Sequence, residues 1–201
     1  MKRWIAIAGA AAAAFVAIYT IEPAALDLDV ARWIAAHRDE GGVTLAEMAS
    51  NGGSVYGIVP LALLIGAWLY RRDGLRPIPW LALAVVGATA LYLVFNHAIE
   101  RARPPTGLRV VVDTAYSFPS GHATQSVAFW LIAAALIGAP YTRRVRMACT
   151  TVALVMIALI GGSRIYLGAH WTTDVLGGYA LGACWLATVL ALRAWRQHAV
   201  L

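Results

Sequence analysis

Six long stretches without a charged side chain are the feature that most limits how this chain can fold. They cover residues 4–21, 48–70, 77–99, 114–142, 147–163 and 175–192. Each is long enough for a helix that crosses a membrane, which takes roughly 17–25 residues. Only 13% of the residues are charged, and a soluble core of this size cannot bury six such segments. The sequence therefore predicts an all-α fold, a bundle of six transmembrane helices.

We expect one domain over residues 1–201, with spans at approximately 4–21, 54–70, 78–98, 122–139, 147–162 and 174–192. The first stretch, after Lys2 and Arg3, also resembles a secretory signal peptide. Its apolar run exceeds the usual signal core of about 7–15 residues, so we interpret it as a retained span, although Ala24-Ala25 leaves the alternative open. Cys149 and Cys184 both fall inside predicted spans, away from other metal ligands, and imply neither a disulfide nor a zinc site.

The basic residues are unevenly distributed between the segments that join these spans. With a cytoplasmic N-terminus, the inner segments hold ten of them: Lys2, Arg3, Arg71, Arg72, Arg76, Arg143, Arg144, Arg146, Arg193 and Arg196. The outer segments hold six, namely Arg32, Arg38, Arg101, Arg103, Arg109 and Arg164, with nine of the ten acidic residues, Glu22 and Asp113 among them. Because positive charge beside spans favours the cytoplasmic side, we expect both termini to be cytoplasmic. The net charge of +6 then needs no nucleic-acid partner.

The first outer loop, residues 22–50, contains a segment with helical periodicity. In "ALDLDVARWIAAH", the residues Leu26, Val30, Trp33, Ile34 and His37 share one face, and Asp27, Asp29 and Arg32 lie off it. This pattern predicts an amphipathic helix at the outer membrane surface, either as a packing element or as part of a lipid entrance. The "SNGGS" at 50–54 is typical of a turn and of the start of the second span.

Two outer segments, residues 96–122 and 163–174, concentrate polar and ionisable side chains. They contain His97, His122 and His170, and four of the six outer arginines. The predicted topology places all of these in one compartment, although they come from separate loops. Ionisable residues at membrane depth are usually functional, so we expect a site here.

Several of these residues suit the binding of a phosphate group. Arg103 and Arg164 carry planar, permanently charged guanidiniums that match phosphate oxygens. Ser120 and Gly121 stand at the start of the fourth span, where backbone N–H groups favour an anion and glycine allows close approach. These features predict an anion site at the outer mouth of that span.

The histidines add the means for phosphoryl transfer. His170 and Asp174 are four residues apart, so on a helical turn the carboxylate can orient the imidazole and raise its basicity. His122 directly follows the predicted anion site. If one histidine attacks phosphorus and the other protonates the leaving oxygen, the transfer proceeds without a metal.

In order and spacing these residues resemble the type 2 phosphatidic acid phosphatase superfamily. This family comprises integral membrane lipid phosphatases as well as soluble vanadium haloperoxidases and acid phosphatases. Its second signature, Pro-Ser-Gly-His, is present at 119–122, and its third, Ser-Arg-x5-His-x3-Asp, at 163–174. The first, Lys-x6-Arg-Pro, is present only in part, because Arg103-Pro104 match but Asn96 stands in place of the lysine.

The resemblance implies a role for each matching residue. His170 would be the nucleophile that forms a phosphohistidine, with Asp174 as its partner. His122 would protonate the leaving group and then activate the attacking water. The implied phosphate ligands are Arg103, Arg164, Ser120 and the amide of Gly121. The resemblance also implies that no metal ion or organic cofactor is needed, and that the site lies at the outer membrane surface.

Asn96 is where the chain departs from the family pattern. Its amide can donate a hydrogen bond to phosphate but cannot supply the charge of a lysine. Three interpretations stay open. The enzyme works with fewer charges on the phosphate, a neighbouring residue such as Arg101, Arg109 or His97 takes over the role, or the protein is catalytically weak or inactive.

The predicted function is hydrolysis of a lipid phosphate, in a multi-pass protein of a bacterial inner (plasma) membrane with a periplasmic or extracellular site. Candidate substrates are isoprenoid pyrophosphates, phosphatidylglycerol phosphate, phosphatidic acid and lipid A phosphates. The partners expected are this substrate and the surrounding membrane lipids. Two alternatives are a phosphotransferase that uses the same site and a non-enzymatic binder or transporter of lipid phosphates. The second predicts a hydrophilic path through the spans, which are almost free of charge.

Overall fold

The computed structural model describes residues 1–20, 25–112 and 115–199, and these residues form no strand. Glu22 and Asp113, counted above among the outer acids, and position 21 of the first predicted span lie outside them. The helices are α1 (Lys2–Thr20), α2 (Ala25–His37), α3 (Glu40–Asn51), α4 (Val55–Asp73), α5 (Ile78–Ile99), the short 3-10 helix η1 (Thr106–Leu108), α6 (Gly121–Gly138), α7 (Arg143–Tyr166) and α8 (Thr172–Ala199). The predicted all-α class is confirmed.

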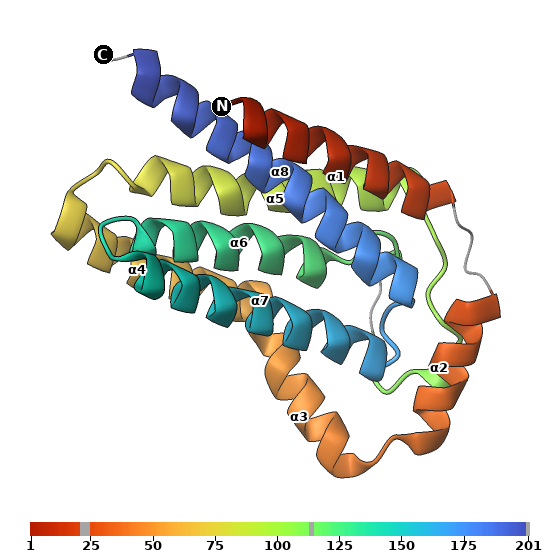
Figure 1. Ribbon diagram of the computed structural model, residues 1–201. Coiled ribbons are helices and arrows are strands. Elements are labelled where there is room, and N and C mark those ends of the chain that lie inside the picture. The colour runs from red at the N-terminus through yellow and green to blue at the C-terminus, as the bar shows by residue number, and fades with distance from the viewer. Residues whose placement is uncertain (21–24, 113–114, 200–201) are drawn as a thin grey trace.

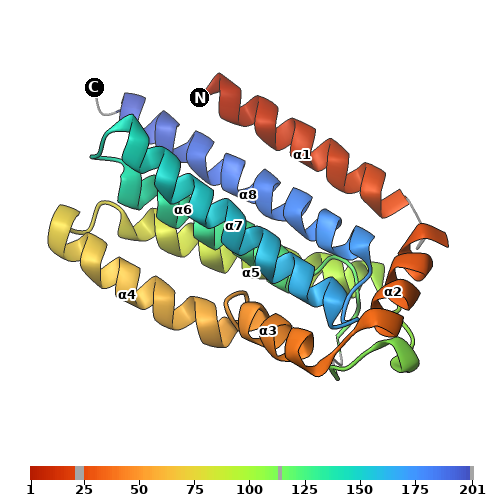
Figure 2. The same cartoon turned by 60° about the horizontal axis from the view of Figure 1, so that its bottom comes forward.

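Helix α6 forms the centre of the bundle. It packs against α5, α7 and α8, and α1 lies along the outer side of α8 (Figures 1 and 2). Phe129, Ile132 and Leu136 of α6 are almost fully buried and pack with Ile58 of α4 and Val189 of α8. An apolar helix that is buried on nearly all sides, with small alanines between the large residues, explains why the other long helices surround it.

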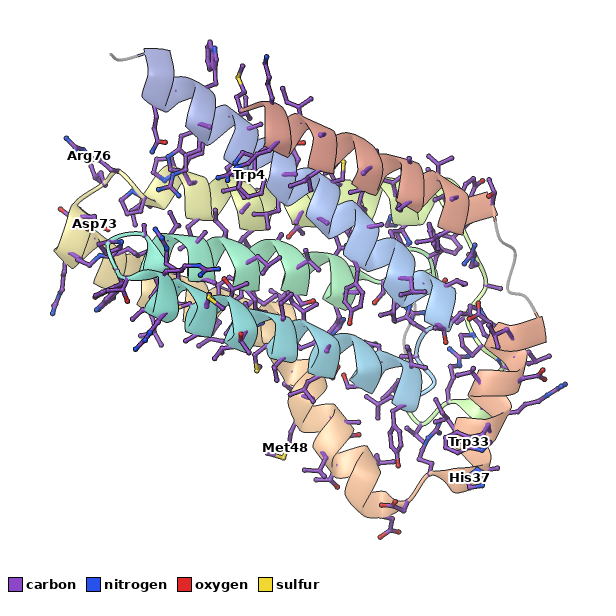
Figure 3. All side chains as sticks on the ribbon, viewed as in Figure 1. Trp4, Trp33, His37, Met48, Asp73 and Arg76 are labelled. Atoms are coloured by element: carbon purple, nitrogen blue, oxygen red, sulfur yellow. The ribbon has the colours of Figure 1, made fainter. Side chains whose placement is uncertain are left out.

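The two ends of the bundle differ in composition and structure. Both termini lie at one end, with the turns between α4 and α5 and between α6 and α7 (Figure 1). Asp73 and Arg76 mark this end in Figure 3, whereas Trp33 and His37 of α2 mark the other. The second end also carries the loop that precedes α6 and the turn between α7 and α8, so the two predicted polar segments meet there.

Among the described residues, five helices are long and apolar enough to cross a membrane: α1, α5, α6, α7 and α8. A sixth candidate is the pair α3 and α4, which is bent by 47°. The predicted span 54–70 corresponds to α4, and α3 was not predicted as a helix. Asp39 begins α3 by accepting a hydrogen bond from Gly42 N at 2.7 Å. Ser54 begins α4 in the same way, and this cap lies at the bend.

Helix α2 occupies the segment with amphipathic periodicity. Leu26 and Trp33 are 72% and 64% exposed, whereas Asp27 on another face is only 3% exposed. The carboxylate of Asp27 accepts hydrogen bonds from Thr173 N and Thr173 Oγ1, at 3.2 and 2.5 Å. Asp27 therefore caps the first turn of α8 and attaches α2 to the bundle, while Leu26 and Trp33 face away from it.

Candidate active site

His170 lies in the tight turn between α7 and α8 and is 4% exposed. The amides of Ala169 and His170 donate to the carbonyl of Arg164, at 3.0 and 3.3 Å. Gly168 adopts a φ of 69°, and a side chain there would collide with the carbonyl of Leu108. Only glycine fits this turn without strain, and the turn carries His170 back towards the end of α7.

The ring of His170 is held in one tautomer when it is neutral. Nδ1 lies 2.8 Å from the carbonyl oxygen of Ser117, which can only accept a hydrogen bond, so Nδ1 carries the proton. The lone pair is then on Nε2, and this atom lies 3.4 Å from Nη1 of Arg103. A nucleophilic nitrogen therefore faces a guanidinium, the group that would attract a phosphate oxygen to it.

The electrostatic surroundings of His170 favour this neutral form. Burial is the main cause that lowers the pKa of His170, and the guanidiniums of Arg103 and Arg164 lower it further. Asp174 opposes them, through hydrogen bonding and charge. The net effect is a pKa below the ordinary value, which keeps the imidazole unprotonated and able to attack at neutral pH.

Asp174 is fully buried and has several donors around it. Oδ1 accepts a hydrogen bond from Nη1 of Arg101 at 3.1 Å, and Oδ2 accepts from Trp171 N at 2.9 Å and from Ser117 Oγ. The distance from Oδ2 to Nδ1 of His170 is 3.6 Å. The expected proximity of the two residues is present, but the nearest acceptor for His170 is the carbonyl of Ser117.

Arg101 links this carboxylate to α2. Its Nη1 also donates to Thr173 Oγ1 at 3.1 Å, and Thr173 in turn donates to Asp27. The guanidinium lies 4.3 Å above the ring of Phe118. From the sequence, Arg101 was a candidate to replace the missing lysine. In the structure it forms an ion pair with Asp174 instead.

The Pro-Ser-Gly-His segment begins α6, as its sequence suggested. Ser120 is the N-cap, and its backbone N–H donates to the carbonyl of Asp174 at 3.0 Å. Gly178 of α8 makes this approach possible, since a Cβ there would lie 2.6 Å from the carbonyl oxygen of Ser120. Gly121 lies directly against the ring of Tyr92. Two of the predicted site segments are thus joined through their main chains.

Arg164 and His122 both lie beside the bend between α3 and α4. Nη1 of Arg164 donates to Oγ of Ser50 at 2.9 Å, and both residues are buried. A Cβ on Gly53 would lie 3.4 Å from Cδ2 of His122. The "SNGGS" segment, expected to be a turn and the start of the second span, therefore also forms one wall around two predicted site residues.

Arg103 is held by the loop that precedes α6. Nε donates to the carbonyl of Ala115 at 2.6 Å, and Nη2 to that of Tyr116 at 3.1 Å. Nη1 donates to the carbonyl of Ala169 at 2.6 Å, beside its approach to His170. The guanidinium is therefore fixed between the two polar segments, next to the predicted nucleophile.

Asn96 is fully buried in the last turns of α5. Its Nδ2 donates to the carbonyls of Tyr116 and Phe118, at 2.9 and 3.2 Å, which uses both of its N–H bonds. Asn96 thus positions the loop that holds Arg103 and Ser117. A direct contact between Asn96 and phosphate stays a prediction.

Comparison with known proteins shows the family to which the chain belongs. The model of the PAP2 superfamily matches residues 77–198, which include all three signature segments. The chain belongs to the PAP2 superfamily. The resemblance inferred from Arg103-Pro104, residues 119–122 and residues 163–174 is therefore confirmed.

Several members of the PAP2 superfamily and related structures are similar to this chain. Phosphatidylglycerophosphatase B of Bacillus subtilis is 36% identical over 132 residues, which are 62% of this chain and 62% of that protein. A decaprenylphosphoryl-5-phosphoribose phosphatase of Mycobacterium tuberculosis is 35% identical over 145 residues, 61% of this chain and 76% of its own length. The match with phosphatidylglycerophosphatase B thus covers less than two thirds of the length of that protein.

Solved structures show that the likeness extends to the whole fold. A transmembrane PAP2 type phosphatidylglycerolphosphate phosphatase from Bacillus subtilis superposes with a TM-score of 0.84 at 25% identity, over 96% of this chain and 97% of that one. Aquifex aeolicus LpxE superposes with a TM-score of 0.66 at 23% identity, over 85% and 98% of the two chains, and supports the fold alone.

Four residues that surround the site were not predicted from the sequence to belong to it: Asp27, Ser50, Ser117 and Thr173. Asp27 and Thr173 hold Arg101 and the start of α8, while Ser50 and Ser117 bond to Arg164 and Asp174. Signals existed for Ser117, which directly precedes the Phe-Pro-Ser-Gly-His segment, and for Thr173, which directly precedes Asp174 in the third signature. Asp27 and Ser50 act through contacts between distant parts of the chain.

Proposed function

We propose that this protein is an integral membrane phosphatase that hydrolyses a lipid phosphomonoester or pyrophosphate through a phosphohistidine at His170. The observation that carries the proposal is the position of Nε2 of His170, unprotonated and 3.4 Å from the guanidinium of Arg103. Three relatives named as a phosphatidylglycerophosphatase, a decaprenylphosphoryl-5-phosphoribose phosphatase and an undecaprenyl-diphosphatase support the substrate class.

In the first step, Nε2 of His170 attacks phosphorus and the bond from phosphorus to the leaving oxygen breaks. Arg103 and Arg164 stabilise the charge on the remaining phosphate oxygens, together with N–H groups at the start of α6. His122 gives its proton to the leaving oxygen. Asp174 stabilises the positive charge that develops on the ring of His170.

In the second step, His122 takes a proton from a water molecule, which attacks the phosphorus of the phosphohistidine. The bond to Nε2 breaks, phosphate leaves, and His170 returns to its neutral form. The Nδ1–H stays bonded to the carbonyl of Ser117 throughout, so the ring keeps its orientation through both steps.

We infer a six-span topology in which α3 and α4 together form the second span. The ten inner basic residues and both termini then lie on the cytoplasmic side, and His170 faces the opposite compartment, periplasmic or extracellular. Helix α2 would rest on the outer surface, with Leu26 and Trp33 turned towards lipid. A lipid phosphate in the outer leaflet would then reach the site from the side of the bundle.

The experiment that tests this function is phosphate release by the purified protein in detergent, with chelator present. The substrates are phosphatidylglycerol phosphate, phosphatidic acid and an isoprenoid mono- and pyrophosphate. We expect release from at least one lipid, and loss of more than about a thousandfold in His170→Ala and His122→Ala. His37→Ala, on the exposed surface of α2, is the matched control and should keep full activity.

Trapping the intermediate separates nucleophile from acid. After an acid-free quench, the wild-type protein should carry labelled phosphate that is stable in base and labile in acid, and His170→Ala should carry none. Equal phosphate release by the wild type and both active-site variants would refute the proposal.

A further inference from the structure

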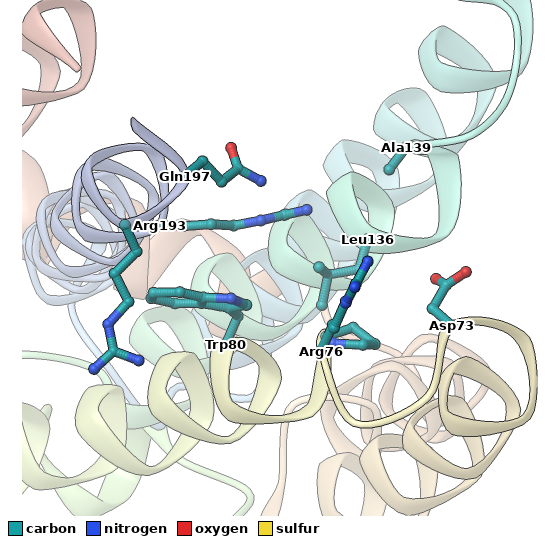
Figure 4. A pocket seen from close by; sticks show the side chains of 9 residues that line it. Asp73, Arg76, Trp80, Leu136, Ala139, Arg193 and Gln197 are labelled. Atoms are coloured by element: carbon teal, nitrogen blue, oxygen red, sulfur yellow. The ribbon is translucent and has the colours of Figure 1, made fainter. Parts of the chain in front are cut away.

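A cavity with several charged residues in its lining lies at the end of the bundle that carries both termini, opposite the end with His170 (Figure 1). It is formed by the turn between α4 and α5, the end of α6 and the last turns of α8, and its volume is about 770 Å³. The lining side chains are those of Asp73, Arg76, Pro77, Trp80, Leu136, Ala139, Arg193, Arg196 and Gln197 (Figure 4). Cavities of this size accommodate small ligands or headgroups.

The charge around this cavity is strongly positive. Arg76, Arg193 and Arg196 come from two different helix ends, and Figure 4 shows Arg193 reaching from α8 over Trp80 towards the side of Arg76. The lining includes one carboxylate, Asp73, and it is already bonded to Nε and Nη2 of Arg72, at 2.9 and 2.5 Å. Within the described part of the chain, the three arginines of the cavity have no carboxylate partner.

Three guanidiniums held together without a counter-ion favour an anion between them. Their mutual repulsion is relieved by a phosphate, which guanidiniums bind with paired hydrogen bonds.

An apolar groove continues from this cavity along the surface of the bundle. A second hollow of about 460 Å³ shares Arg76, Trp80 and Arg196 with the first and adds Pro79, Leu83, Leu192 and Trp195. Leu192 and Trp195 are 43% and 55% exposed on α8. Positive charge at one end and exposed apolar side chains beyond it match a phosphate headgroup and its acyl chain.

We propose that this arginine cavity, defined by Arg76, Arg193 and Arg196, binds the phosphate of an anionic phospholipid from the membrane leaflet opposite the catalytic site. The bound lipid neutralises the three arginines and holds the turn between α4 and α5 to the end of α8. The proposal needs the bundle to span a membrane but does not depend on catalysis at His170.

The test is lipid binding by purified protein, followed by native mass spectrometry. The wild type is titrated with phosphatidylglycerol, with zwitterionic phosphatidylcholine, and with inorganic phosphate. We expect one tightly held phosphatidylglycerol, at least tenfold weaker retention of phosphatidylcholine, and no comparable effect of inorganic phosphate. The double variant Arg193→Gln/Arg196→Gln should lose at least tenfold in affinity for phosphatidylglycerol.

The matched control is Arg143→Gln/Arg144→Gln, which removes two exposed arginines from the same end of the bundle but outside the cavity. It should bind phosphatidylglycerol like the wild type. Thermal unfolding without lipid checks that both double variants fold, and phosphatidylglycerol should raise the melting temperature of the control but not of the cavity variant.

Equal affinities in the two double variants would overturn the assignment of the site. Binding of inorganic phosphate as tight as that of the lipid would overturn the lipid as its ligand. Phosphate release by the cavity variant should equal that of the wild type. A failure of the lipid-binding proposal therefore leaves the catalytic proposal untouched, and a failure of the catalytic proposal leaves the lipid-binding proposal untouched.

Discussion

Arg101 donates a hydrogen bond to Asp174 at 3.1 Å, and the two side chains are only 9% and 0% exposed. This ion pair joins the end of α5 to the start of α8, directly behind the candidate nucleophile. Since Arg101 neutralises much of the charge on Asp174, the carboxylate stabilises a protonated His170 less than a lone carboxylate would. We therefore expect Arg101 to act as a positioning residue that, through Asp174, helps to keep His170 neutral.

Replacing Arg101 with glutamine should therefore lower activity and shift its pH dependence. We expect kcat to fall about 10–100-fold, with a smaller change in KM, because Asp174 loses the donor that orients it. Without the guanidinium, the charge of Asp174 acts fully on His170, raises its pKa and moves the acid limb of kcat/KM to higher pH. Arg101→Lys should restore part of both effects, and Arg32→Gln, on the exposed face of α2, should show neither. An acid limb that stays in place would argue against this role.

The wild-type acid limb should itself lie below the ordinary histidine pKa of about 6.5. Burial and the two neighbouring arginines lower the pKa of His170, so the neutral nucleophile persists as the pH falls. The measurement is kcat/KM against pH with a lipid monophosphate and with a lipid pyrophosphate. The substrates also titrate, so an acid limb is assigned to the enzyme only where it is the same with both. The same shift means that the unfolded chain binds the proton more readily, so stability should decline as the pH falls below about 6.5. A common limb at pH 7 or above would contradict the expectation.

Gly168→Ala should destabilise the protein strongly. The residue has a φ of 69°, and a Cβ there would collide with the backbone of Leu108. We expect a loss of about 2–4 kcal/mol in the free energy of unfolding, together with loss of activity, because the turn that carries His170 must move. Gly162→Ala is the control, since a Cβ at that helical position meets no atom within 4 Å. It should be neutral or slightly stabilising in thermal unfolding, and equal melting temperatures for the two variants would refute the argument.

Asn96→Leu tests whether Asn96 holds the loop before α6. Leucine has a similar size but no donor, so the carbonyl of Phe118 loses the bond from Asn96 at a cost of about 1–3 kcal/mol, while that of Tyr116 keeps only its bond from Arg103. The melting temperature and kcat should both fall. Asn96→Lys keeps donors at this position and should be less destabilised, while any change of KM across the lipid panel would report on phosphate contact. A leucine variant as stable as the wild type would show that these hydrogen bonds contribute little.

The helices could be predicted well from the sequence, apart from α3. Long uncharged stretches identify α1 and α4 to α8, because a membrane permits almost no other structure for them. Gly41 and Gly42 weaken the local preference for a helix at the start of α3. Gly42 is needed there because the ring of Tyr166 occupies the space that a side chain would fill. A contact between residues 124 positions apart thus overrides local propensity, and no local pattern reveals it.

For the site, family signatures identify His170, His122, Asp174, Arg103 and Arg164 without a structure. Which arginine faces Asp174 could not be predicted, because it depends on the path of the chain after α5 rather than on spacing. The same holds for Ser50, which reaches Arg164 only because α3 folds back against α7. Sequence patterns therefore identify the candidate reacting groups, whereas the groups that orient them depend on tertiary contacts.

The main-chain hydrogen bond from Ser120 N to the carbonyl of Asp174 would separate the proposed chemistry from the choice of substrate. It joins the segment that carries His122 to the first turn of α8, which directly follows His170, without using any side chain. Mutations on the exposed surfaces of α2 and α3 would then accumulate without altering the spacing of the candidate reacting groups. Selection could thus exchange one lipid tail for another at little cost to catalysis, which is consistent with relatives named for such different lipids.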